Sequence, residues 1–176
     1  MKSKYVWALL VALMSVGAYA AVASATPPSG VSNPPWSPVI GRFPTGLDAT
    51  AKTDINPGSA TDFWQMRIEA KGATDVHILE NVIHPGGTFG WHSHPGPNLV
   101  IVKSGTLSVY HASDCTPQDF GPTSGLGSTF IDQGHDLHMV RNNATVDADV
   151  YVVSFVPAGF QRRIDEPNPN PSSCPN

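Results

Sequence analysis

Three histidines are the residues of this chain whose types and spacing are best suited to chemistry. His92 and His94 are separated by a single residue, and His138 lies downstream. Residues two apart in a β-strand point to the same face, so His92 and His94 can grip one ion while His138 closes the site from another strand. Neutral imidazoles are the commonest transition-metal ligands. The spacing therefore predicts a site for a divalent transition metal (Fe, Mn, Ni, Cu or Zn) without selecting among these ions.

The surroundings of the histidines resemble the two sequence motifs of the cupin superfamily. The resemblance covers roughly residues 75–157, although Gly134 stands one residue too far from His138 for the second motif. It implies an all-β fold, a double-stranded β-helix or jelly-roll barrel, in which the motif histidines point into the barrel mouth. The matching positions are Gly86, His92, His94 and Gly105 in the first motif, and His138 and Asn142 in the second.

Asn98 departs from this pattern, because the family carries a metal-binding glutamate at its position. The expected site is therefore three histidines completed by water, with the open coordination positions typical of catalytic metal sites. Asn98 is kept as a tentative ligand, or as a residue that orients a water or substrate. Without the glutamate, the ion keeps its full charge, which favours an anionic ligand. The alternative is a site that has lost its metal.

The residues around the third histidine carry further hypotheses. His135 lies three positions before His138, so in a regular strand the two side chains face opposite ways and only His138 is expected inside. Asp132 and Asp136 are candidates for a general base, but two exposed turn carboxylates are the expected interpretation. The sequence contains no nucleophile elbow and no glycine-rich phosphate loop, so any catalysis would have to be metal-assisted.

Composition restricts the class of protein. The 176 residues are 40% hydrophobic and only 14% charged, with 17 prolines and 16 glycines, which is typical of a turn-rich β-protein. The net charge is −4 and basic residues form no cluster. We therefore exclude nucleic acid as a partner and expect a small-molecule ligand or substrate.

The first 25 residues have the pattern of a signal peptide. Lys2 and Lys4 precede an apolar stretch over 6–23, and Ala23-Ser24-Ala25 fits a cleavage site that leaves Thr26 first. We expect secretion, to the extracellular space or the periplasm, with no stable membrane association after cleavage. An uncleaved membrane anchor is the alternative.

An exported protein meets an oxidising compartment, where an even pair of cysteines is expected to form a disulfide. Cys115 and Cys174 are the only cysteines of the chain. Their bond would tie the proline-rich C-terminal tail, 161–176, back onto the barrel.

The pattern of apolar residues and turn residues predicts an N-terminal arm over 26–60 and a barrel over 61–160. The arm would wrap the barrel or a partner subunit, which makes a homodimer one expected assembly. Pro85-Gly86-Gly87 is predicted to be a turn, and 98–103 with 106–111 a hairpin, the first of its strands buried on both faces. Other expected strands are 61–70, 74–84, 89–94, 128–132, 137–142 and 146–157.

Three functions fit these observations. The first is a secreted metalloenzyme that acts on a small anionic or oxygen-rich molecule, in the manner of dioxygenases, decarboxylases or isomerases. The second is a non-catalytic module that binds a small ligand or a metal. The third is a structural cupin with a degenerate site. The fold does not choose among them, because one fold hosts many functions.

Overall fold

A computed structural model describes residues 24–58 and 63–176 of the chain. The predicted signal peptide lies outside this part up to residue 23 and stays a prediction. Nowhere in the described residues is there a helix with the length and apolarity needed to span a membrane. The strands are β1 Ser29–Ser32, β2 Val39–Phe43, β3 Gly46–Asp54, β4 Phe63–Lys71, β5 Thr74–Ser93, β6 Asn98–Ser104, β7 Leu107–His111, β8 Gln118–Phe120, β9 Thr129–Asp132, β10 His138–Arg141, β11 Ala148–Pro157 and β12 Ile164–Asp165.

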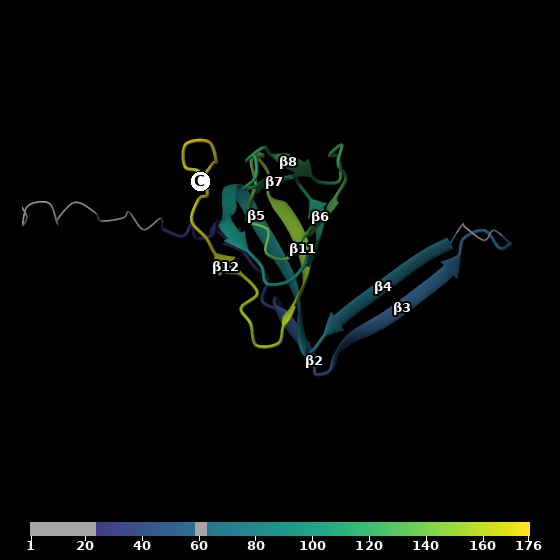
Figure 1. Ribbon diagram of the computed structural model, residues 1–176. Helices are drawn as coiled ribbons and strands as arrows, with labels where there is room; N and C mark the ends of the chain where they lie inside the picture. Colours follow the sequence, from purple (N-terminus) through teal and green to yellow (C-terminus); the bar gives the residue numbers. More distant parts are fainter. Residues whose placement is uncertain (1–23, 59–62) are drawn as a thin grey trace, which may run out of the picture.

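The long strand β5 joins two antiparallel sheets into one barrel (Figure 1). Its first half pairs with β11, which continues to β6 and β9. Its second half pairs with β10, which continues to β7 and β8. The two sheets face each other across the core, and the described residues contain no helix. The predicted all-β double-stranded β-helix is therefore confirmed by the strand pairing of the chain itself.

The predicted turn at residues 85–87 is wrong, because β5 runs without interruption from Thr74 to Ser93. Gly86 and Gly90 have φ angles of 75° and 69°, which glycine adopts without a steric penalty. The pairing of β5 with β1 and with β10 shifts register beside these glycines, as expected for β-bulges. The glycines therefore bend the strand from one sheet into the other instead of ending it.

The predicted hairpin of residues 98–103 and 106–111 is also wrong. Strand β6 pairs with β11 and β9, whereas β7 pairs with β10 and β8 in the opposite sheet. Gly105, with a φ of 76°, carries the chain between the sheets, and a Cβ there would lie only 2.5 Å from the Asp147 carbonyl oxygen. The short connection is therefore a crossing between sheets.

The core fills the space between the sheets. Its fully buried members come from five strands and include Ile83, Leu107 and Val150. Strand β6 is buried on one face only, since Leu99 and Ile101 are 37% and 50% exposed, which contradicts the expectation from its run of apolar residues. The inner face of this strand supplies Val100 and Val102 to the core, as its alternation predicts.

The C-terminal tail folds back over the second half of β5. Cys115 and Cys174 form the predicted disulfide, with their Cα atoms 5.2 Å apart. Cys174 packs into a second apolar cluster with the fully buried Trp91, whose indole Nε1 donates a hydrogen bond of 2.8 Å to the Pro175 carbonyl. Strand β12 pairs with Ser93 and His92 of β5. The tail is therefore part of the wall beside the histidines.

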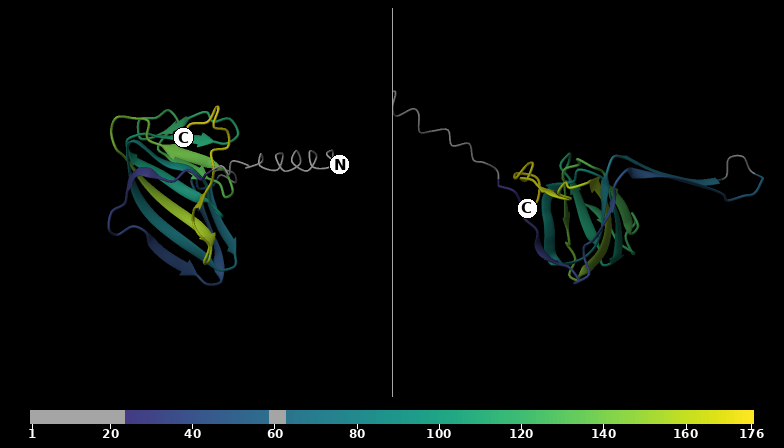
Figure 2. Two further views of the ribbon diagram at one scale, coloured as in Figure 1. Left: turned by 90° about the vertical axis from the view of Figure 1, so that its left-hand side faces the viewer. Right: turned by 90° about the horizontal axis from the view of Figure 1, so that it is seen from below.

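The residues expected as an N-terminal arm form three strands. Strands β1 and β2 pair with β5 at the edge of the barrel, whereas β3 pairs only with β4. The β3–β4 hairpin projects away from the barrel in two views (Figures 1 and 2). It spans the expected boundary between 26–60 and 61–160, and that division stays a prediction.

Candidate metal centre

The fold brings the three predicted histidines together. His92 and His94 lie on β5, and His138 on β10 is the direct cross-strand partner of His92. Their candidate ligand nitrogens all lie within 4.8 Å of one another. The rings are only 2–4% exposed, so the cluster is inside the barrel and not on its surface. A buried cluster of three imidazoles at this spacing suggests a transition-metal site.

The backbone fixes the orientation of all three rings through the same ring nitrogen. Nδ1 of His92 lies 2.8 Å from the Gly90 carbonyl oxygen, Nδ1 of His94 lies 2.6 Å from that of Arg162, and Nδ1 of His138 lies 3.0 Å from that of Asp136. Because a carbonyl only accepts, each neutral ring carries its proton on Nδ1. The Nε2 atoms then present lone pairs, as in metal-binding histidines whose second nitrogen is held by the protein.

Burial also keeps the imidazoles of His92 and His94 neutral. It lowers the pKa of His92 well below its ordinary value, with His138 and Arg163 contributing. Burial likewise lowers the pKa of His94 to about 3, against the Arg162 carbonyl, which raises it. Metal ligation requires the unprotonated nitrogen, so both side chains are in the binding form at neutral pH.

Asp132 is the main site residue that sequence reasoning misplaced. Instead of an exposed turn carboxylate, it is a buried side chain, 5% exposed. Its Oδ2 lies 3.2 Å from Nε2 of His94 and 3.3 Å from Nε2 of His138. The alternation of β9 held the signal, since Phe130 faces the cavity and Asp132 is two residues further on.

Asn98 lines the same cavity and lies beside the Asp132 carboxylate. It is the cross-strand partner of Asp132, and its Nδ2 donates a hydrogen bond of 2.6 Å to Asp132 Oδ2. The side chain is 1% exposed. Asn98, the tentative ligand, therefore contacts Asp132, whose carboxylate in turn lies against His94 and His138.

The cavity in front of the histidines is small and enclosed by the tail. Its volume of about 40 Å³ leaves room for about three water molecules. Arg162 and Arg163 line it, and burial beside Arg163 lowers the pKa of Arg162 to about 10. The two arginines follow the last barrel strand in sequence, where no pattern indicates that the chain turns back over the site.

Phe89 and His135 flank the histidine cluster. Strand alternation alone would turn Phe89 away from His92, three residues further on, but Phe89 lines the cavity, with its ring centroid 6.2 Å from that of His92. The bulge at Gly90 reverses the alternation between them. His135 lies outside the histidine cluster, as expected, and its backbone nitrogen donates a hydrogen bond to the His94 carbonyl at 2.7 Å.

Asn142, the last residue of the second motif, stabilises the fold through hydrogen bonds to backbone groups. Its side-chain Nδ2 donates to the carbonyls of Ile83 and Val146 at 2.8 and 2.7 Å, and its Oδ1 accepts from the Ala144 nitrogen at 2.9 Å. It is fully buried. The residue therefore holds the loop after β10 against β5, away from the ligand atoms.

No family model matches the chain, and no curated protein matches it in sequence. Among solved structures, a cupin-like protein from Thermotoga maritima is 16% identical, with 56% of this chain and 69% of that one covered and a TM-score of 0.43. The polyketide cyclase RemF from Streptomyces resistomycificus is 15% identical over 72% and 78% of the chains, with a TM-score of 0.44. Oxalate oxidase in complex with glycolate is 22% identical over 47% of this chain and 42% of that one, with a TM-score of 0.39.

These matches are distant, and the chain spans less than half the length of the oxalate oxidase that it matches. The double-stranded β-helix fold of this chain is established by its own strand pairing. Its function has to be argued from the residues in the barrel.

Proposed function

We propose that the chain binds a divalent transition metal through His92, His94 and His138 and acts on a small anionic molecule bound beside it. The observation that carries the proposal is the common orientation of the three rings. Each has Nδ1 tied to a backbone carbonyl, which leaves Nε2 as the ligand atom, and the candidate ligand atoms of the three residues lie within 4.8 Å of one another. When bound, the ion would supply Lewis-acid or redox chemistry to the ligand.

The surroundings of the cluster fit a metal ion. Two buried oxygen atoms, Asp132 Oδ1 and Asn98 Oδ1, have no hydrogen-bond partner in the described part of the chain. Buried polar atoms without partners cost free energy, and an ion with its bound water would satisfy them. Most of the remaining wall is apolar and limits the access of bulk water to the imidazoles; its apolar residues include Val100, Leu107, Val140 and Val152.

The arginines define the class of small molecule. The Arg162 guanidinium makes no hydrogen bond within residues 24–58 and 63–176, although it lines the cavity. A guanidinium offers a planar pair of donors that matches a carboxylate. Arg163 donates instead to the Phe89 carbonyl and to Asp165 Oδ1, so it is already engaged. We therefore assign the recognition of a small carboxylate to Arg162.

Calorimetric titration of the metal-loaded protein with formate, the smallest carboxylate, tests this function. We expect formate to bind, uncharged formamide not to bind, and Arg162→Gln to weaken formate binding at least tenfold. Arg67→Gln on the distant hairpin is the matched control and should bind like the parent. Equal anion affinity in the parent and in Arg162→Gln would contradict the assignment.

A binding module without turnover is the second candidate. It is favoured by the closure of the site, since the histidine rings are 2–4% exposed and the tail covers them. Consumption of the bound carboxylate by the metal-loaded protein, followed by NMR, separates the two. Loss of substrate supports an enzyme, whereas stoichiometric binding without chemical change supports the module.

We also propose that the chain is exported and cleaved before Thr26. The Cys115–Cys174 disulfide supports this, because such bonds persist in oxidising compartments. N-terminal sequencing of the protein recovered from its native compartment should begin at Thr26. Retention of residues 1–25 would instead favour the membrane anchor.

A further inference from the structure

A carboxylate occupies the centre of the candidate site although the family's glutamate position holds Asn98. Asp132 comes from β9, the strand next to the one that carries Asn98, and the two residues are direct cross-strand partners. Its Oδ2 reaches Nε2 of both His94 and His138 at 3.2 and 3.3 Å. The negative group is therefore displaced by one strand and not missing.

We propose that Asp132 is the fourth protein ligand of the metal and that Asn98 positions its carboxylate. The inference rests on the proposed three-histidine centre. The Asn98 amide donates a hydrogen bond to Oδ2 at 2.6 Å, which restricts rotation of the carboxylate. The other oxygen, Oδ1, is buried and has no hydrogen-bond partner in the described residues, so it is available for a further interaction.

The charge balance of the site favours ligation over a purely structural role. A 5% exposed carboxylate surrounded by neutral rings needs a positive partner to offset its desolvation. Among the described residues that line the cavity, only Arg162 and Arg163 are permanently positive, and Arg163 already pairs with Asp165. Arg162 attracts Asp132 electrostatically but forms no hydrogen bond or ion pair with it in the described residues. A divalent ion among the three Nε2 atoms would supply the charge that the carboxylate lacks.

Metal affinity, measured by competition with a chelator, tests the role of Asp132. We expect Asp132→Ala and Asp132→Asn to lower affinity for the metal 10- to 100-fold. Restoring a carboxylate at the family position in the Asp132→Ala/Asn98→Glu double variant should recover most of that loss. Asp147→Asn, which removes an exposed carboxylate paired with His84, is the matched control and should bind like the parent.

The visible spectrum of the Co²⁺-loaded protein gives a second readout. It should change in Asp132→Asn, which keeps the size and shape of the side chain but removes its charge. Metal bound equally tightly by the parent and Asp132→Asn, with an unchanged spectrum, would overturn the ligand role while leaving the three-histidine centre intact. A parent that takes up no metal would overturn both proposals.

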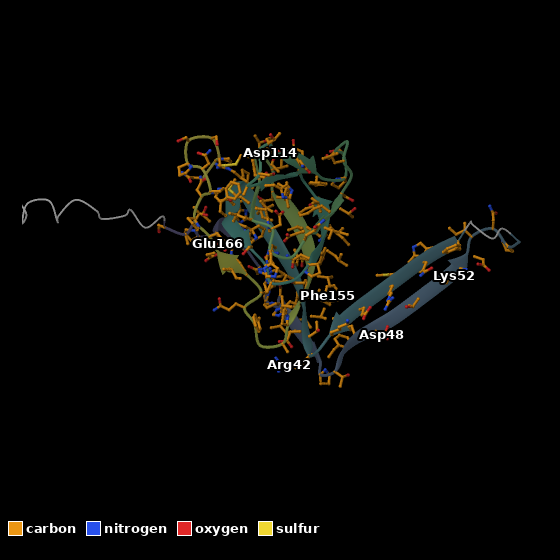
Figure 3. The ribbon with its side chains drawn as sticks, in the orientation of Figure 1. Arg42, Asp48, Lys52, Asp114, Phe155 and Glu166 are labelled. Atoms are coloured by element: carbon orange, nitrogen blue, oxygen red, sulfur yellow. A yellow bond between two sulfur atoms is a disulfide. The ribbon has the colours of Figure 1, made fainter. Side chains whose placement is uncertain are left out.

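A different observation concerns the projecting hairpin. The register of β3 and β4 sorts its side chains onto two faces. One face is polar except for Phe63, over whose ring Lys52 lies, and its Asp48 and Lys52 are labelled in Figure 3. The other is apolar except for Thr53, and its Trp64 and Met66 are 49% and 41% exposed. The apolar face is formed by Leu47, Ala49, Ala51, Trp64, Met66, Ile68 and Ala70.

The outer face of the barrel sheet is also apolar. A continuous row crosses five strands in register, and four of its members are 37–64% exposed. Large apolar areas on both faces of an antiparallel sheet are unusual in a monomer, where one face normally meets water. The row consists of Val39, Ile78, Val153, Leu99 and Ile131, and Val76, Ile101, Tyr151 and Phe155 flank it.

We propose that a second copy of this chain covers both faces. The hairpin and the sheet meet in one open groove, which Met66 and Ile68 line from the hairpin and Leu99 and Phe155 from the barrel. In a dimer with two-fold symmetry, each hairpin would lie on the sheet of the partner. The same symmetric contact would then cover the apolar face of the hairpin and that of the sheet in both copies. An isolated two-stranded hairpin is marginally stable in water, so the partner would also stabilise it.

The size of the two faces fits this assembly. The hairpin and the sheet offer seven and nine apolar side chains per copy, before their polar rims are counted. Specific interfaces use about 20–30 residues on each side. The remaining polar face of each hairpin, with Asp48, Lys52 and Arg67, would form the outer surface of the dimer.

Sedimentation equilibrium of the parent tests the proposal. We expect twice the chain mass at micromolar concentration and the single-chain mass in Trp64→Glu/Met66→Glu. Thr50→Glu/Gln65→Glu, on the polar face of the same hairpin, should stay dimeric. A parent of single-chain mass, or one that gains mass only with lipid vesicles or another protein, would overturn the second copy as occupant, as would a dimer that survives Trp64→Glu/Met66→Glu.

Discussion

The barrel mouth buries polar side chains, whereas the β3–β4 hairpin exposes apolar ones. The barrel mouth buries His92, Asn98 and Asp132, which are 4%, 1% and 5% exposed. The hairpin leaves Trp64 and Met66 about half exposed. Buried polar groups need partners, and large exposed apolar faces need a cover. In our two proposals, an ion would satisfy the polar groups of the barrel mouth and a second copy of the chain would cover the hairpin.

Breaking the disulfide should affect the barrel mouth strongly and the hairpin not at all. Cys115→Ser/Cys174→Ser releases a closed segment with a sequence separation of 59. The chain-entropy model gives a loss of about 4 kcal/mol in the free energy of unfolding. The same change frees the tail whose Arg162 carbonyl orients His94, so metal affinity should fall too.

Urea denaturation and chelator competition measure these two effects. The mass of the protein in solution is the control and should equal that of the parent. The hairpin lies far from both cysteines in sequence and makes no strand pair with the tail, so breaking the disulfide should leave it unchanged. A double variant with parental stability and metal affinity would contradict the structural role of the tail.

Asn142→Ala separates the framework of the barrel from its ligand atoms. Its side chain makes three hydrogen bonds to backbone groups of Ile83, Ala144 and Val146. Leaving these buried groups without partners should lower the free energy of unfolding by about 3 kcal/mol. Metal stoichiometry at saturating ion should stay at the parental value. Loss of the metal at a temperature where Asn142→Ala is fully folded would contradict this division of roles.

Removing one methyl group from an isoleucine in each region compares how tightly the two regions are packed. Ile83 is fully buried in the barrel core, whereas Ile68 lies half-buried on the hairpin. Ile83→Val should lower the free energy of unfolding by about 1 kcal/mol. Ile68→Val should change it by less than about 0.5 kcal/mol at concentrations where the chain is monomeric. Equal losses in urea denaturation would show that the hairpin is packed within a single chain.

The smallest effect concerns the ion pair that holds β2 to β5. Arg42 donates to both carboxylate oxygens of Asp75 at 2.6 and 2.8 Å. This pairing, with a hydrogen bond from the Gly159 nitrogen, holds the pKa of Asp75 well below its usual range. Because the folded-state pKa lies below the unfolded value of about 3.9, the stabilisation is complete at neutral pH and is lost as pH falls below about 4.

Asp75→Asn should therefore be less stable than the parent at pH 7, and the gap should narrow at pH 3. Urea midpoints at the two pH values measure it. A gap that stays constant with pH would mean that the ion pair does not contribute through the charge of Asp75.

The parts of the site that lie within one strand could be predicted from the sequence. His92 and His94 share a face because of strand alternation, and His138 was placed by its motif spacing. Asp132 was misplaced because two carboxylates near a glycine are usually solvated. Its burial depends on the pairing of β9 with β6, which is a long-range contact.

The remaining failures have the same kind of cause. The bulge at Gly90 turned Phe89 into the cavity, and alternation alone contains no information about a bulge. Arg162 reaches the site only because the tail returns over β5, a path held by the disulfide and by β12. Local patterns therefore predicted most strands after residue 61 but missed the three strands within residues 26–60. The pairing of strands across the barrel determined which polar groups surround the histidines.

Elemental analysis of the mature protein, residues 26–176 without a histidine tag, tests the central claim most directly. After incubation with Fe, Mn, Ni, Cu or Zn and removal of free ions, we predict about one metal ion per chain. We predict none in His92→Ala/His94→Ala and parental metal content in His84→Ala/His135→Ala, which removes two histidines outside the cluster. No bound metal in the parent with any of the five ions would contradict the proposed metal centre.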